Sequence, residues 1–134
     1  MILPILAALL LAQSSAAEPA PDCANALTQA DMTTCATRDW QASDAALNMQ
    51  WEQTAAHMRQ RDIMYDHSHD DRPGFREQLL AAQRAWLGYR DAHCATEGSL
   101  ARGGTLEPML VAQCTAELTR QRTRQLQSIE EWPE

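Results

Sequence analysis

Residues 83–94 read QRAWLGYRDAHC, and the spacing of their side chains decides the fold. Side chains that recur every three or four residues lie on one face of an α-helix. The positions that share such a face here are Gln83, Trp86, Leu87, Arg90 and Cys94. Because Trp86 and Leu87 are large and apolar, we predict that the segment is the packed C-terminal half of a helix rather than an active site.

The sequence on both sides of this segment predicts three helices. The central one is expected over residues 74–97, where Gly98 stops it. An uninterrupted periodic stretch predicts a first helix over residues 29–62, and a third is expected over residues 106–130, with Thr105 as its N-cap. Helices joined by short loops favour antiparallel neighbours. The sequence therefore predicts an all-α fold, a three-helix up-down-up bundle stapled by two disulfides.

Four cysteines, an even set, support the disulfides. The up-down-up order brings all of them to one end of the bundle, and no CxxC pair suggests a zinc site. Of the three possible pairings, joining nearest neighbours closes the shortest loops and is preferred, while the other two stay open. The cysteines are Cys23, Cys35, Cys94 and Cys114.

The N-terminal segment predicts export. Residues 1–17 carry no charged side chain, include an apolar run too short to span a bilayer, and end in small residues before Glu18. We therefore expect a signal peptide over residues 1–17, a single domain over residues 18–134, and a periplasmic or secreted protein without membrane insertion.

The charge of the chain restricts its partners. The formal net charge is −7, and all eleven basic residues are arginines. Because nucleic acids and anionic membranes attract basic surfaces, neither is an expected partner, whereas a cationic protein is.

The sequence contains no established catalytic motif, so we expect no enzyme, no cofactor and no metal centre. The stretch HSHDD at residues 67–71 offers imidazole and carboxylate groups that can bind transition metals. Since it falls in the expected first connection, we interpret it as a solvated acidic loop.

Polar residues at apparently inward positions predict a structural network. A buried or half-buried arginine needs a carboxylate partner, and Asp44 is the candidate for Arg90 or Arg122. The network is expected to comprise Asp44, Asn48, Gln83, Arg90 and Arg122.

The combined spacing of these residues resembles the LprI-like family of lysozyme inhibitors, which are small exported helical proteins of bacteria. The matching positions are Cys23, residues 28–32, Cys35, residues 44–48, Trp51, residues 83–86, residues 89–91, Cys94, residues 103–105, Cys114, residues 118–120 and Arg122. Two departures are Trp51, where the family usually has tyrosine, and the absence of a lipoprotein signal before Cys23. The resemblance implies a helical, disulfide-linked domain and suggests inhibition of lysozyme.

The expected function is therefore binding and inhibition of lysozyme, a cationic muramidase. The alternative is a non-inhibitory module of the cell envelope that binds another protein, a peptide or a metal ion. The candidate contact is the glycine-rich loop at residues 98–104, through Ser99 and Arg102. In the other interpretation, this loop only connects two helices.

Overall fold

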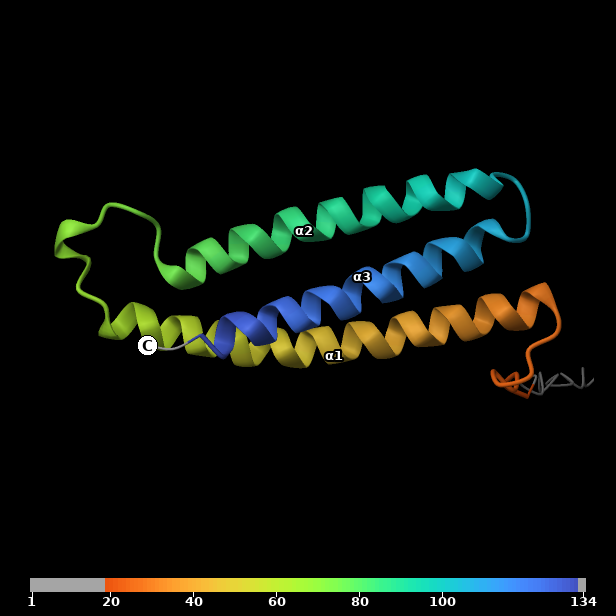
Figure 1. Ribbon diagram of the computed structural model, residues 1–134, viewed down its shortest axis with the longest axis horizontal. Helices are drawn as coiled ribbons and strands as arrows, with labels where there is room; N and C mark the ends of the chain where they lie inside the picture. The colour runs from red at the N-terminus through yellow and green to blue at the C-terminus, as the bar shows by residue number, and fades with distance from the viewer. Residues whose placement is uncertain (1–18, 133–134) are drawn as a thin grey trace, which may run out of the picture.

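The computed structural model describes residues 19–132, which form an antiparallel bundle of three long helices (Figure 1). These are α1 (Gln29–Met64), α2 (Phe75–Gly98) and α3 (Glu107–Glu130), with single 3₁₀ turns η1 (His67–His69) and η2 (Ser99–Ala101) in the connections. No strand occurs within residues 19–132. The predicted all-α, up-down-up fold is confirmed, with each helix end within two residues of its expected place. The expected signal peptide at residues 1–17 lies outside the described residues.

Local hydrogen bonds are found at both ends of α1. The Thr28 hydroxyl accepts a hydrogen bond from the Asp31 backbone N–H at 3.0 Å, which satisfies a donor that the first turn leaves free. At the other end, Tyr65 adopts an extended conformation and donates its backbone N–H to the Arg61 carbonyl. The helix has 36 residues and is the longest element of the bundle.

The predicted start of the third helix was wrong in its detail. The N-cap of α3 is Leu106 and not Thr105, and no side chain caps the helix there. Glu107 instead folds back, and its carboxylate accepts a hydrogen bond from the Gly103 backbone N–H at 2.9 Å. Gly103 has a φ of 79°, in the left-handed region that glycine adopts without strain.

A small apolar core lies where the three helices meet. Partly buried aromatic and aliphatic side chains surround it, among them Trp51, Phe75, Trp86 and Ile129. Leu126 is fully enclosed, and its backbone carbonyl accepts a hydrogen bond from the buried Thr54 hydroxyl at 3.2 Å. The buried core residues are Leu47, Ala55, Met58, Leu79 and Leu126.

Leu87 is 37% exposed, so its prediction as a core residue was wrong. The reason is the uneven packing of α2, which contacts α3 more extensively than it contacts α1. Leu87 lies on the edge of α2 that faces the shallow groove toward α1, where it lines an open pocket with Leu80 and Trp51.

Both ends of α2 are held closely. At its start, the Asp62 carboxylate accepts backbone N–H bonds from Phe75 at 2.6 Å and Arg76 at 3.0 Å. At its end, Gly98 lies so close to α3 that a Cβ atom there would collide with the Val111 side chain. A glycine is therefore needed where α2 meets α3.

The two disulfides join Cys23 to Cys35 and Cys94 to Cys114. The preferred nearest-neighbour pairing is thus confirmed. The first ties the lead-in segment to the start of α1, and the second ties the end of α2 to the start of α3, so both lie at the same end of the bundle (Figure 1).

Candidate functional site

Arg90 is the centre of a polar cluster between the helices. Its side chain is only 9% exposed, and its guanidinium Nη1 lies 3.4 Å from Asp44 Oδ1 on α1 and 3.3 Å from the Thr119 hydroxyl on α3. Nε donates to Asp91 Oδ1 at 2.9 Å. The structure therefore places the anticipated Asp44 beside Arg90. It also adds two partners that the sequence analysis missed.

Arg122 is also buried, but no carboxylate faces it within the described residues. Nε donates to Gln83 Oε1 at 2.9 Å and Nη1 to Gln125 Oε1 at 3.1 Å, while Nη2 has no partner there. Burial lowers the pKa of this guanidinium, because removing a cation from water disfavours its charged form. The expected Asp44 partner for Arg122 is thus replaced by amide oxygens.

Trp86 lies against both arginines. The guanidinium carbon of Arg90 is 5.2 Å from the ring centroid, and that of Arg122 is 6.0 Å away. An aromatic face attracts a cation at such distances, most strongly where water is excluded. Trp86 therefore helps to stabilise two buried charges as well as packing against the core.

Asn48 is exposed, so the expectation that it is buried was wrong. Its side-chain amide donates to Asp44 Oδ2 at 3.4 Å, one helical turn away on α1. Asp44 itself is 43% exposed. The network is therefore buried at the arginines and open to water at its α1 edge.

This asymmetry predicts unequal effects of mutation. Arg90→Ala should lower the free energy of unfolding by about 2–3 kcal/mol, because it removes three hydrogen-bonding contacts and leaves the Thr119 hydroxyl buried. Asp44→Ala should cost less than about 1 kcal/mol, since Asp91 still pairs with Arg90 and the lost contact is half-exposed. Urea denaturation of both variants tests which substitution is the more destabilising. Equal decreases in the free energy of unfolding would contradict the prediction.

The loop at residues 98–104 is built on the second disulfide. Ser99 begins η2. Its hydroxyl donates a hydrogen bond to the Ala95 carbonyl of α2 at 2.7 Å, so the hydroxyl proton is not available to a partner. Arg102 ends η2, is exposed, and forms no side-chain hydrogen bond or ion pair with residues 19–132. Leu100 is 87% exposed. Leu100 and Arg102 are therefore the large side chains of the loop that face solvent.

Two aspartates at the HSHDD segment, Asp70 within it and Asp66 just before it, accept local hydrogen bonds. Asp70 accepts two side-chain hydrogen bonds from Arg72, at 2.8 and 2.6 Å, and one from the Tyr65 hydroxyl at 3.1 Å. The Arg72 contacts hold the pKa of the Asp70 carboxyl well below its usual range. Asp66 accepts the Ser68 backbone N–H at 2.9 Å. The segment is mostly exposed, as expected of a solvated acidic loop, and these bonds hold it locally.

A different group of potential metal ligands lies beside the second disulfide. His93 Nε2 is 3.0 Å from Glu97 Oε1, and Cys114 Sγ is close to both. The Cys114 sulfur is bonded to Cys94, however, and a disulfide sulfur is not the thiolate that binds metals. This group therefore forms an ordinary surface contact next to the disulfide.

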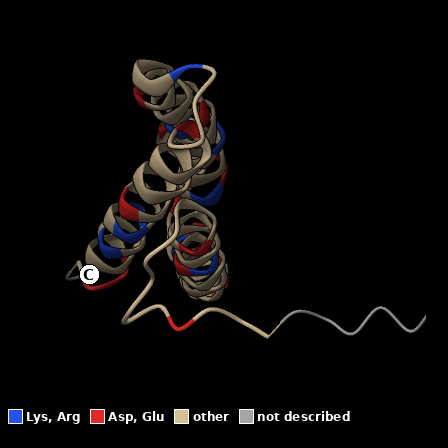
Figure 2. Ribbon diagram, turned by 90° about the vertical axis from the view of Figure 1, so that its right-hand side faces the viewer, with Lys and Arg blue, Asp and Glu red and all other residues tan. Residues whose placement is uncertain are grey.

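None of the helices among residues 19–132 combines the length and the apolar character needed to cross a membrane. Acidic and basic residues both occur along the three helices (Figure 2). Part of the net charge of −7 comes from the connection at residues 65–74, which holds three aspartates and one arginine.

Comparison with known proteins identifies the family. The family described as lysozyme inhibitor LprI matches residues 22–126, a range that includes both disulfides and the residues around Arg90. An uncharacterized protein of Rhizobium meliloti (strain 1021) is 44% identical over 120 residues, covering 90% of this chain and 86% of that protein. No solved structure is significantly similar. The chain therefore belongs to the LprI family of lysozyme inhibitors.

Proposed function

We propose that this protein is exported and that it binds and inhibits lysozyme. The observation that carries the proposal is the family match over residues 22–126. The two disulfides also support it, because such bonds persist in oxidising compartments outside the cytoplasm, where a muramidase would be met.

The charge of the protein supports a cationic partner. A net charge of −7 attracts a basic protein over distances longer than any single contact, which raises the association rate. Since salt screens this attraction, with a Debye length of about 8 Å at physiological ionic strength, binding should weaken as salt is added.

The contact that we propose is the loop at residues 98–104, through Ser99 and Arg102. Arg102 is exposed and has no partner within the described residues, so its guanidinium is free to take a carboxylate in a muramidase cleft. The Ser99 hydroxyl donates to Ala95 but can still accept a hydrogen bond. The disulfide between Cys94 and Cys114 holds both ends of the loop, so binding would require little ordering.

The test is a lysozyme activity assay with the purified, oxidised protein at two ionic strengths, together with direct measurement of binding. We expect dose-dependent inhibition that is stronger at low salt. A lysis rate that is independent of dose at both salt concentrations would contradict inhibition. Binding without loss of activity would favour a non-inhibitory module of the cell envelope.

A double substitution tests the loop. Ser99→Ala with Arg102→Ala should weaken inhibition by about tenfold, the value of one charge-assisted hydrogen bond. The matched control is Ser68→Ala with Arg59→Ala, an exposed pair away from the disulfide end, which should keep full inhibition. Equal inhibition by both double variants would show that the loop is only a connection.

A further inference from the structure

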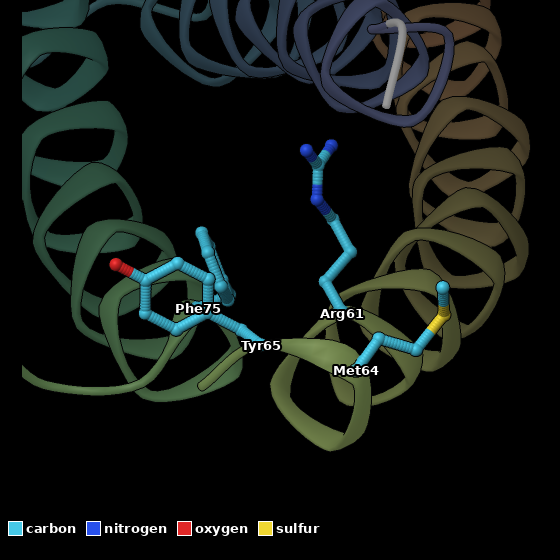
Figure 3. A pocket seen from close by; sticks show the side chains of 4 residues that line it. All are labelled: Arg61, Met64, Tyr65 and Phe75. Atoms are coloured by element: carbon cyan, nitrogen blue, oxygen red, sulfur yellow. The ribbon is translucent and has the colours of Figure 1, made fainter. Parts of the chain in front are cut away.

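The end of the bundle far from the disulfides carries two adjoining open pockets. The larger has a volume of about 450 Å³ and lies where the last turns of α1 and α3 meet the start of α2. The smaller, of about 170 Å³, is lined by Arg61, Met64, Tyr65 and Phe75 (Figure 3). Arg61 and Phe75 line both pockets, so the two adjoin at these side chains.

The walls of the larger pocket are mostly apolar. Met58, Phe75, Ile129 and Trp132 line it, together with the Ser128 hydroxyl and the Arg61 side chain. Trp132 is 71% exposed, so its ring forms an outer wall of the site rather than part of the core. Pockets for small ligands are typically about 300–1,000 Å³ and combine apolar walls with a few polar groups. The larger pocket meets both conditions.

Among residues 19–132, Arg61 is the only cation that lines these pockets. Its guanidinium projects into the space between the helices (Figure 3) and lies 5.6 Å from the Phe75 ring centroid. It forms no hydrogen bond or ion pair with any side chain of residues 19–132. The adjacent carboxylate, Asp62, is occupied by the backbone N–H groups of Phe75 and Arg76. The guanidinium thus retains its capacity to bind a carboxylate through two parallel hydrogen bonds.

An apolar wall with one arginine, which no described residue pairs, matches a particular ligand chemistry. We propose that this site binds a medium-chain fatty acid, with the carboxylate on Arg61 and the hydrocarbon chain along Met58, Phe75, Ile129 and Trp132. A cationic amphiphile would place its charge against Arg61 and be repelled. A multiply charged phosphate would need more donors than this site offers. The site lies away from the loop at residues 98–104, so the proposal does not depend on lysozyme inhibition.

The test is titration calorimetry of the disulfide-bonded protein with dodecanoate below its micelle concentration. We expect saturable binding at one site, with a change in tryptophan fluorescence that Trp132→Phe removes. Dodecyltrimethylammonium, which carries the opposite charge on the same chain, should show no saturable binding.

Three variants separate the role of Arg61 from that of the fold. Arg61→Gln should weaken dodecanoate binding by about tenfold or more, because a charge-assisted pair is lost. Ser128→Asp places a negative charge in the wall, at an exposed position that does not support the core, and should weaken binding similarly. Arg59→Gln, an exposed arginine on the same helix outside both pockets, should bind as the unmodified protein does. Circular dichroism checks that all three retain the helical fold.

Several results would overturn the proposal. One is the absence of saturable dodecanoate binding, and another is equal affinity in the Arg61→Gln and Arg59→Gln variants. Binding of a peptide with an apolar C-terminus, without binding of dodecanoate, would also overturn it and would identify a docking site for a protein.

Discussion

Leu126→Ala is expected to lower the free energy of unfolding by about 4 kcal/mol. Leu126 is the largest fully enclosed apolar side chain of the bundle, and it lies in the core cluster with Leu47 and Met58. Removing its methyl groups loses the free energy gained by transferring them from water into the core. It also leaves a cavity that the three helices close only in part. Urea denaturation with the disulfides intact measures the loss.

Leu27→Ala provides the control for this prediction. It removes the same atoms from a leucine that is 90% exposed and lies outside the core. A surface substitution of this kind should change stability by no more than about 0.5 kcal/mol. If the two variants unfolded at similar urea concentrations, the core would have to lie elsewhere than the region around Leu126.

Trp86→Ala is expected to lower the free energy of unfolding by about 3–5 kcal/mol, an effect similar to that of Leu126→Ala. The ring packs against the core cluster and lies beside the guanidinium groups of Arg90 and Arg122. Its removal therefore takes away packing and also weakens the environment of two buried cations. The same denaturation experiment measures this loss, and near-ultraviolet circular dichroism reports whether the surrounding side chains remain fixed.

Trp132→Ala is the matched control, since Trp132 is mostly exposed and lies at the other end of the molecule from the disulfides. It should unfold nearly as the unmodified protein does. A change below about 0.5 kcal/mol for Trp86→Ala as well would place that ring outside the core. Residues 83–94 would then have to be reconsidered as a binding face.

The sequence predicted the helices and disulfides well because both follow from local spacing. Residues three or four apart share a helix face whatever surrounds them, and the order of the helices brought the cysteines together. Asp44 was correctly anticipated as a neighbour of Arg90, since a buried cation needs an anion.

Contacts that depend on how the helices rotate against one another were not predictable in this way. Arg122 pairs with Gln83 and Gln125, although amide partners have no distinctive sequence signal. Leu87 looked buried by its spacing, but α2 leans toward α3 and leaves it half-exposed. Arg61 resembles any basic residue in the last turn of a helix. Its unpaired position in a pocket emerges only when three helix ends are placed together.

The uneven attachment of α2 has a consequence for how the molecule opens. Its buried face is partly polar, with Gln83 and Arg90 beside Leu79, and α2 packs less extensively against α1 and α3 than those two helices pack against each other. Local opening is least costly where few apolar contacts are broken, and α2 is therefore the element expected to detach first, while α1 and α3 stay paired. The bond between Cys94 and Cys114 would keep the C-terminal end of the detached α2 next to α3. The N-terminal end of α2 would then move away and return while the helix stays attached.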